Sequence, residues 1–304
     1  MLGIDLGGTK IAAGLVSFPS ATILAKEVIP TMAGRGGEAI LADTLAVARR
    51  LQSHASARGK TLTGIGVGIA ELVNLRGEIT SDHLIKWRNL PVQEAFSQIA
   101  RTRFESDARA PALAEAIFGA GKDFSNFVYL TVGTGISYSL VLDGRPYPGA
   151  HGNALMVASG PLTSECEQCG AIQDQVLEEF AAGPSLVSRY NHRANASVTT
   201  GQQVTAAAAS GDRIATEIVL SAGAALGNSV GFLINVLDPQ AVIVGGGLGL
   251  AGGLYWHSFV NSAHKHIWSE VSRDLPIIQA KLGADASILG AAATMLQVEL
   301  QGGI

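Results

Sequence analysis

Two short turns in the sequence combine glycines with residue types that bind phosphate groups. The first reads Asp5-Leu6-Gly7-Gly8-Thr9-Lys10, an acid followed by two glycines, a hydroxyl and a basic residue. Glycines allow backbone N–H groups to approach a phosphate closely, and a carboxylate such as that of Asp5 can hold Mg²⁺ directly or through water. A tight hairpin would use the same glycines, so this stretch alone leaves both interpretations open.

A second turn of the same kind, Gly133-Thr134-Gly135, lies in a matching context. The segments "LGIDLGGTKIAAGLVSF" (2–18) and "FVYLTVGTGISYSLVLDG" (127–144) both consist of an apolar run, a turn with glycine and threonine, and another apolar run. This weak internal similarity predicts two α/β halves that each open with a hairpin. Two such turns facing each other across a cleft would hold the β- and γ-phosphates of a nucleoside triphosphate from both sides.

A third glycine stretch, Gly245-Gly246-Gly247, follows Asp238-Pro239 and the apolar run "AVIV". Glycines between a strand and a helix would form a flat floor for a purine or sugar ring. The stretch does not open the first βαβ unit, where the dinucleotide-binding fingerprint belongs. A P-loop is excluded as well, because Asp123 follows Gly121-Lys122 and Ala116 stands where the earlier glycine is required.

The tripeptide Glu105-Ser106-Asp107 ends an apolar run just before an alanine-rich segment. Asp107 is a candidate general base that accepts the proton of an attacking hydroxyl. It is also a candidate N-cap for a helix over 108–121. The two roles are compatible, because a capping carboxylate stays ionised.

The elements that must position these residues follow from the hydrophobic pattern. Strands joined by turns are predicted within 2–30, at 63–70 and at 103–107, with helices at 36–57, from Pro91 and at 108–121, the last ending at glycine. Further helices are predicted at about 171–191, 201–209, 212–237, 251–267 and 285–299, with strands at "AVIVGG" and "PIIQAKL". No low-complexity linker separates the halves, which favours a cleft between packed lobes. Trp87 is predicted either to line that cleft or to pack elsewhere in the protein.

Composition places the chain in a broad class. Its 304 residues are 47% hydrophobic and 15% charged, as in globular proteins, and a net charge of −4 offers no basic surface for nucleic acid. The glycine-broken apolar runs are too short to span a bilayer, and no signal peptide precedes "LGIDLGG". Two cysteines cannot form a disulfide framework, so we expect a cytoplasmic protein with reduced thiols that acts on a small molecule.

Eight stretches occur in the order seen in the ROK family, which the chain resembles over nearly its whole length. That family comprises bacterial-type sugar kinases, including glucokinases and N-acetylmannosamine kinases, together with related transcriptional repressors. The stretches are "GIDLGGTKIAAG", "GIGVGIAELVN…G…W", "ESDARAPALAEAIFGAGK", "LTVGTGIS", "GAHG", "LEEFAAGPSL", "LDPQAVIVGGG" and "GADASILGAA".

The resemblance implies the two-lobed α/β fold of the actin–hexokinase–Hsp70 superfamily, an actin-like ATPase (ribonuclease H-like) fold with a central cleft. Residues 1–107 plus about 288–304 would form the smaller lobe and 108–287 the larger one. It also implies ATP and Mg²⁺ as cofactors, transfer of the γ-phosphoryl group to a sugar hydroxyl, usually the primary one, and a homodimer. The "DLGGTK" and "GTG" turns resemble the two phosphate loops, and Asp107 resembles the catalytic base.

The departures from the family pattern lie among the sugar-binding residues. Ser106 replaces the asparagine of the family's "END", and Glu71 stands where a glycine lets the sugar approach. The glutamate and histidine of the family's "GExGH" become Met156 and Ser159. The pocket predicted from the resemblance also contains His151, Gly152, Asp107 and Glu178, which matches the glutamate of the family's "CLE".

These replacements remove three polar contacts, each worth on the order of 1 kcal/mol. They argue against plain glucose as the acceptor. A less hydroxylated, differently oriented or bulkier ring, such as an amino sugar, a deoxy sugar or a carbocyclic polyol, would fit better.

The two cysteines, Cys166 and Cys169, match part of the family's zinc site, which uses three cysteines and a histidine. Ser159 and Val176 stand at the histidine and the last cysteine, so two ligands remain where a structural zinc site needs four. We therefore expect no zinc. A redox pair is disfavoured because the thioredoxin-like strand–helix setting is missing.

Two other functions compete with a kinase. A catalytically silent sugar or nucleotide sensor of the same fold would explain the altered substrate motif, although Asp5, Lys10, Thr134 and Asp107 are all kept. A repressor of the family would carry an N-terminal winged-helix domain, whereas this sequence starts at the first predicted strand.

Overall fold

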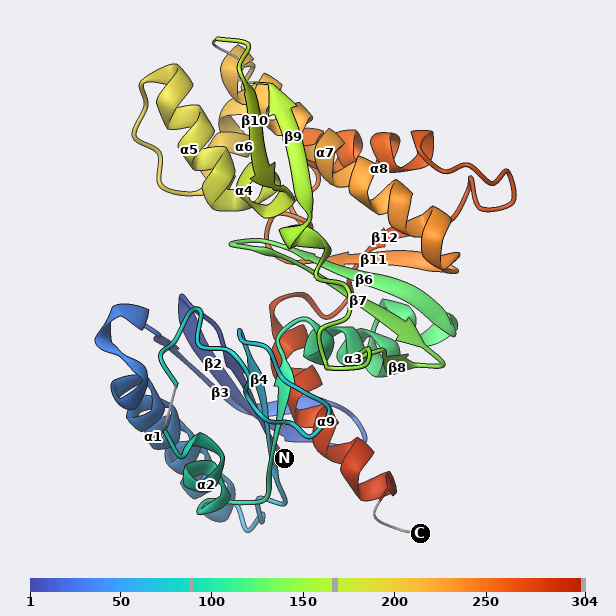
Figure 1. Ribbon diagram of the computed structural model, residues 1–304. Coiled ribbons are helices and arrows are strands. Elements are labelled where there is room, and N and C mark those ends of the chain that lie inside the picture. The colour runs from blue at the N-terminus through green and yellow to red at the C-terminus, as the bar shows by residue number, and fades with distance from the viewer. Residues whose placement is uncertain (88–89, 166–168, 302–304) are drawn as a thin grey trace. The chain divides into compact units, whose positions relative to one another are not determined.

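The computed structural model describes residues 1–87, 90–165 and 169–301, with 297–301 described by their backbone alone. The chain divides into two compact units. The first contains Met1–Asp123, Val141–Ala154 and Ala284–Ile304, and the second contains Phe124–Leu140 and Leu155–Gly283 (Figure 1). The first unit combines one five-stranded sheet with helices, and the second unit combines most of another five-stranded sheet with helices. The predicted α/β architecture is therefore confirmed.

The first unit is built on a sheet in the order β3-β2-β1-β4-β5. Its strands are β1 (Leu2–Leu6), β2 (Lys10–Ser17), β3 (Thr22–Pro30), β4 (Ile65–Ile69) and β5 (Thr102–Ser106). The first three form antiparallel hairpins, whereas β1, β4 and β5 run parallel to one another. Parallel neighbours need crossover connections. These connections contain α1 (Gly37–Ser56), between β3 and β4, and α2 (Val92–Ser97), between β4 and β5.

Helices cover both faces of this sheet. The pair α1 and α2 lies on one face, and α3 (Arg109–Phe118) and α9 (Ala286–Gln301) lie on the other (Figure 1). Glycines on the strands allow α9 to approach closely. A Cβ on Gly3 would lie 2.0 Å from the carbonyl oxygen of Ile288, and one on Gly66 would lie 1.7 Å from that of Ala291. The alternating side chains Leu2, Ile4 and Leu6 point to the opposite face and join its buried core.

The second unit contains β6 (Asn126–Val132), most of β7 (Ile136–Leu142), β11 (Ala241–Gly245) and β12 (Ile277–Gln279), in the order β12-β11-β6-β7. The short strand β8 (Arg145–Pro146) pairs with the end of β7, within the segment that belongs to the first unit. A separate two-stranded sheet is formed by β9 (Pro161–Glu165) and β10 (Ile172–Val176). The helices are α4 (Leu177–Ala181), α5 (Gly183–Ala194), α6 (Gly201–Ala209), α7 (Arg213–Leu237) and α8 (Gly253–Lys265). Short 3₁₀ helices complete the protein at Ala33–Arg35, Ala120–Asp123, Val157–Ser159 and Gly283–Asp285.

The long helix α7 forms the centre of the second unit. By length and composition it could cross a membrane, so the expectation that every apolar run is too short does not hold for this segment. This is weak evidence for a span, because the core helix of a soluble protein passes the same test, and 56% of the apolar window is buried inside the protein. Its close packing on α8 depends on glycine: a Cβ on Gly227 would lie 2.4 Å from the carbonyl oxygen of Phe259.

Two boundaries differ from those predicted. The helix expected at 171–191 is wrong at its start, because 172–176 forms strand β10, which pairs with β9. Helical structure begins only at Leu177. The first unit also includes α3, which the resemblance assigned to the larger lobe at 108–287. The reason is packing: a Cβ on Gly290 of α9 would lie 1.8 Å from the carbonyl oxygen of Ala110, so α3 and α9 are in tight contact.

Candidate active site

The carboxyl ends of three parallel strands meet at one edge of the first sheet. Leu6 of β1 pairs with Ile69 of β4, which pairs with Ser106 of β5. The Gly7-Gly8 turn, the Ala70-Glu71 segment and Asp107 therefore leave the sheet together. The backbone N–H of Asp107 donates to the carbonyl oxygen of Ile69, 3.0 Å away. Ligands of open α/β sheets bind at this carboxyl edge, which makes it the candidate site of the first unit.

The turn after β1 is held by backbone and side-chain hydrogen bonds. The N–H of Gly7 donates to the carbonyl oxygen of Lys10 at 3.1 Å, and the Thr31 hydroxyl donates to the carbonyl oxygen of Gly7 at 2.6 Å. A Cβ on Gly8 would lie 2.5 Å from Cδ2 of Leu84, so this exposed side chain would have to turn away if Gly8 were replaced. Thr9 and Lys10 are exposed at the tip, where their side chains can reach a ligand.

Asp5 points to the face of the sheet that α9 covers. Burial raises the pKa of its carboxyl group to about 6, although the charge of Lys10 and a hydrogen bond with Ser287 act in the opposite direction. A buried carboxylate with incomplete compensation is stabilised by a nearby cation. Asp5 therefore fits the Mg²⁺ role expected of it.

The raised pKa of Asp5 makes a prediction about stability. Between pH 3.8 and about pH 6 the unfolded chain ionises this group while the folded chain keeps its proton, so the free energy of unfolding falls as pH rises through this window. Asp5→Asn should remove that loss and stabilise the protein at pH 8 by up to about 3 kcal/mol. The difference should vanish near pH 4 in urea unfolding measured across pH. The exposed Asp274→Asn serves as the control, and an equal pH dependence of both variants would contradict the burial of Asp5.

Glu71 occupies a position at the same edge, but its carboxylate is already fully used. Its side chain is buried, and Oε1 accepts the backbone N–H groups of Leu84 at 2.8 Å and Ile85 at 3.0 Å. Its Oε2 accepts the N–H of His83 at 3.0 Å and the Ser81 hydroxyl. A carboxylate has about four acceptor sites, so none remains for a sugar. The predicted substrate contact of Glu71 is thus corrected: this side chain holds the segment 81–85, whose Leu84 lies against Gly8.

Removing this carboxylate should destabilise the protein. Glu71→Ala leaves one buried backbone N–H group (Ile85) and two partly buried ones (His83 and Leu84) without an acceptor, which predicts a loss of about 2–4 kcal/mol in the free energy of unfolding. Hydrogen exchange of the Leu84 and Ile85 amides should also become faster. The exposed Glu270→Ala is the matched control and should change little. A raised KM for the sugar without any loss of stability would instead support a substrate role for Glu71.

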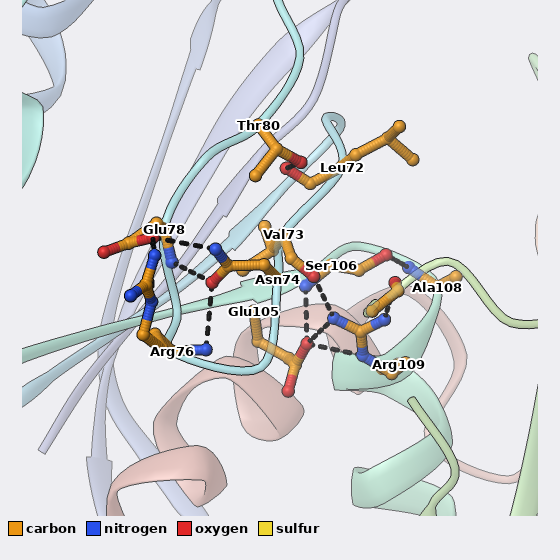
Figure 2. Close-up of polar contacts among 11 residues, drawn as sticks. Leu72, Val73, Asn74, Arg76, Glu78, Thr80, Glu105, Ser106, Ala108 and Arg109 are labelled. Atoms are coloured by element: carbon orange, nitrogen blue, oxygen red, sulfur yellow. Dashed lines mark hydrogen bonds and ion pairs between the residues drawn. The ribbon is translucent and has the colours of Figure 1, made fainter. Parts of the chain in front are cut away.

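Asp107 follows β5 directly and is partly buried. The prediction that it caps the next helix is wrong by one residue, because α3 starts at Arg109 and its N-cap position is Ala108. The Ser106 hydroxyl accepts the N–H of Ala108 at 3.2 Å instead (Figure 2). Ser106, which stands where the family has the longer asparagine, thus forms a local hydrogen bond at the start of α3.

A buried arginine, which the sequence analysis did not single out, ties this edge together (Figure 2). Arg109 is 7% exposed, and its Nε donates to Oε1 of Glu105 at 2.6 Å. Its Nη2 donates to the carbonyl oxygen of Val73 at 3.0 Å, and its Nη1 donates to the carbonyl oxygen of Gly152. One guanidinium therefore joins the segment after β4, the end of β5 and the 148–152 loop. The signal in the sequence was an arginine at the first position of α3, a helix rich in alanine.

The remaining predicted substrate residues of the first unit lie on the 148–152 loop. Gly152 is buried with a φ of 85°, and a Cβ there would lie 2.1 Å from the carbonyl oxygen of Val73. The preceding His151 is exposed. Trp87 is 4% exposed and lines a cavity of about 510 Å³ beside the 77–82 segment, so it is a buried residue of the first unit.

The second unit brings its own predicted residues together around the turn after β6. The N–H of Gly133 donates to the carbonyl oxygen of Gly135 at 2.9 Å. The N–H of Gly183 donates to the carbonyl oxygen of Gly133 at 2.8 Å. A Cβ on Gly133 would lie 3.8 Å from the backbone nitrogen of Gly247, so the second and third glycine stretches are neighbours. Gly246 has a φ of 83°, and a Cβ there would lie 2.3 Å from the carbonyl oxygen of Val132. The exposed Thr134 lies at the tip of the turn.

Glu178, at the start of α4, contacts this turn. Its Oε2 accepts the backbone N–H of Ile136 at 2.7 Å and would lie 2.7 Å from a Cβ on Gly135. The structure thus gives this predicted substrate residue a contact with the glycine turn. Met156 and Ser159 are both exposed near the 3₁₀ helix Val157–Ser159.

The cysteine motif is described only in part. Cys169 is an exposed free thiol, whereas Cys166 lies outside the described residues. Among the residues that the structure describes, no group of three or more His, Cys, Asp and Glu side chains is placed to hold a metal ion.

Comparison with solved structures identifies the class of protein: the chain has the fold of the actin-like ATPases that phosphorylate sugars. A ROK family glucokinase from Streptomyces griseus, solved in complex with glucose and AMPPNP, gives a TM-score of 0.82 at 27% identity, covering 98% of this chain and 99% of that chain. The model of the ROK family matches residues 1–298. The chain belongs to the ROK family.

Curated relatives include both kinases and regulators. The chain is 29% identical to a glucokinase from Streptomyces coelicolor, over 96% of each chain. It is 25% identical to a xylose repressor from Caldicellulosiruptor bescii, over 97% of this chain and 78% of the relative.

Proposed function

We propose that this protein transfers the γ-phosphoryl group of ATP to a hydroxyl of a sugar or sugar-like polyol, usually the primary one. One observation carries the proposal: the pairing of β1, β4 and β5 brings the Gly7-Gly8 turn and Asp107 to the same edge of one sheet. A phosphate loop beside a carboxylate base is what a hydroxyl kinase needs. The similarity to glucokinases supports the same conclusion.

In this mechanism Asp107 accepts the proton of the attacking hydroxyl as its oxygen bonds to the γ-phosphorus. The bond from that phosphorus to the β–γ bridging oxygen breaks, and ADP leaves. In the first unit, backbone N–H groups of the Gly7-Gly8 turn would bind phosphate oxygens, with the charge of Lys10 beside them. In the second unit, the turn at Gly133–Gly135, with the hydroxyl of Thr134, is a second candidate phosphate-binding turn. Gly245–Gly247 would support the nucleotide. Asp5 would hold Mg²⁺, directly or through water, and the ion would supply charge neutralisation on the phosphates. Most of the rate enhancement then comes from positioning and electrostatics.

The acceptor is proposed to be an amino sugar, a deoxy sugar or a cyclic polyol. The described side chains support this: the carboxylate of Glu71 is taken up by the 81–85 segment, and Ser106 is a short hydroxyl. Among the described side chains of the first unit, Ser106, Asp107 and His151 are then the proposed polar contacts for the acceptor. Fewer polar contacts suit a ring with fewer or differently placed hydroxyls.

The test is a panel of hexoses, N-acetylhexosamines, amino sugars and cyclitols, measured by ADP release. We expect kcat/KM for the best acceptor to exceed that for glucose. Glucose as the best substrate would contradict the acceptor class while leaving the kinase activity intact. Absence of turnover with every acceptor, with ATP still bound, would favour the silent sensor.

A further inference from the structure

A second cavity of the first unit lies at the opposite end of β5 from Asp107 and is lined by arginines. It has a volume of about 190 Å³. Its polar lining consists of Arg76, Gln93, Arg101, Thr102 and Arg103, and Met295 of α9 contributes to the wall. None of the described lining residues is acidic, although the chain as a whole carries a net charge of −4.

The charges in this cavity are only partly compensated. Arg76 is exposed and bound by Glu78 within the 74–78 turn (Figure 2). Among the described residues, no carboxylate forms an ion pair with Arg101 or Arg103. The Nε–H of Arg103 is buried and has no hydrogen-bond partner in the described part of the protein. A buried guanidinium N–H without a partner is costly, so the positive charge of Arg103 is incompletely compensated by the described residues.

Arginines on an edge strand often serve to prevent aggregation with other sheets. That role needs an exposed, hydrated charge, and it would explain Arg101. It does not explain Arg103, whose side chain is half-buried with Nε out of contact with solvent. Arg103 also lines a neighbouring cavity of about 130 Å³, which contains Arg145. Arg103 therefore borders two cavities that each contain further arginines, and the smaller one also contains Glu105, which is paired with Arg109.

We propose that the cavity lined by Arg76, Arg101 and Arg103 binds the phosphate group of a small molecule, at a site separate from the Gly7-Gly8 turn and Asp107. Arginine forks match phosphate oxygens in geometry, and a group of about two negative charges suits several guanidiniums better than a carboxylate does. The volume is below the roughly 300–1,000 Å³ of pockets for larger ligands, which favours free phosphate or the phosphate end of a monoester.

The experiment measures binding of radiolabelled inorganic phosphate to the full chain by equilibrium dialysis, with saturating Mg²⁺ and AMPPNP present to occupy the nucleotide site. We expect about one phosphate per chain, and about a tenfold or greater loss of affinity in Arg103→Gln. Arg101→Gln, on the exposed side of the cavity, should also weaken binding. Arg273→Gln, an exposed arginine of the second unit, is the matched control and should bind as the parent protein does.

Two further arms complete the design. Competition with a hexose 6-phosphate distinguishes the two ligands. A site for a monoester would release labelled phosphate more readily to the hexose 6-phosphate than to unlabelled phosphate, and a site for free phosphate would not. Equal displacement by chloride at the same concentration would overturn the proposal, as would unchanged binding in Arg103→Gln and Arg101→Gln. If AMPPNP itself failed to bind, the proposed kinase function would fail, but the effect of the arginine variants on phosphate would still decide this site.

Discussion

Asp107→Asn should lower the turnover of sugar phosphorylation by about 10²–10⁴-fold and leave ATP binding unchanged. The amide keeps the size of the side chain and its place after β5 but cannot accept the proton of the acceptor hydroxyl. The affected step is the chemical one, so kcat should fall far more than the KM for ATP rises. Steady-state ADP release, together with calorimetric titration of AMPPNP, separates the two quantities.

This variant also separates the kinase from the sensor. In a catalytically silent sensor the parent protein would show no sugar-dependent ADP release, and Asp107→Asn would change nothing measurable. The exposed Asp274→Asn in the second unit is the matched control, because it makes the same change of charge away from the candidate site. Turnover in Asp107→Asn equal to that of the control would contradict the assignment of the base.

Much of the site's backbone could be predicted from the sequence, because its signals are local. The apolar runs flanking "LGGT" and "VGTG" predicted the strand pairs β1–β2 and β6–β7. The helix predicted at 108–121 does end at a glycine, but at Gly119 and not at Gly121. Gly3 and Gly66 alternate with large apolar residues because the face of the sheet on which the glycines lie is in close contact with the backbone of α9. The positions of the turn glycines and of Asp107 at strand ends could therefore be predicted from local sequence, and their roles in catalysis stay predictions.

The roles of the buried charges could not be found in this way, because their partners are distant in sequence. The carboxylate of Glu71 is used by donors at 81–85, and its neighbourhood forms only when that segment folds back over it. Arg109 reaches Val73 and Gly152, which come from two other parts of the chain. The start of β10 was likewise missed, because its pairing with β9 outweighed the helical appearance of the sequence that follows.

Arg109→Met should destabilise the protein by about 3–5 kcal/mol, as expected when one partner of a buried ion pair is removed. Glu105, whose side chain is 19% exposed, would keep its charge without a partner. The carbonyl oxygens of Val73 and Gly152 would lose their donors as well. Arg109→Lys should recover only part of the loss, because a lysine cannot reproduce three directed hydrogen bonds.

The chain contains a natural comparison for this change. Arg213 and Glu217 form another i,i+4 pair, at 2.7 Å, but their side chains are 80% and 41% exposed. Arg213→Met should therefore cost less than about 1 kcal/mol. In urea unfolding, similar losses for Arg109→Met and Arg213→Met would contradict the structural role of burial at Arg109.

A double variant identifies the source of the loss and connects it to function. Glu105→Gln combined with Arg109→Met removes both charges, so it should be more stable than Arg109→Met alone because no unpaired charge is left in the protein. It still lacks the donor to Val73 and Gly152, and the loop of Gly152 carries the candidate sugar contact His151. The KM for the sugar should therefore stay raised in the double variant, while the KM for ATP remains near that of the parent. Recovery of both stability and sugar KM would show that Arg109 acts only by neutralising Glu105, and not by positioning these loops.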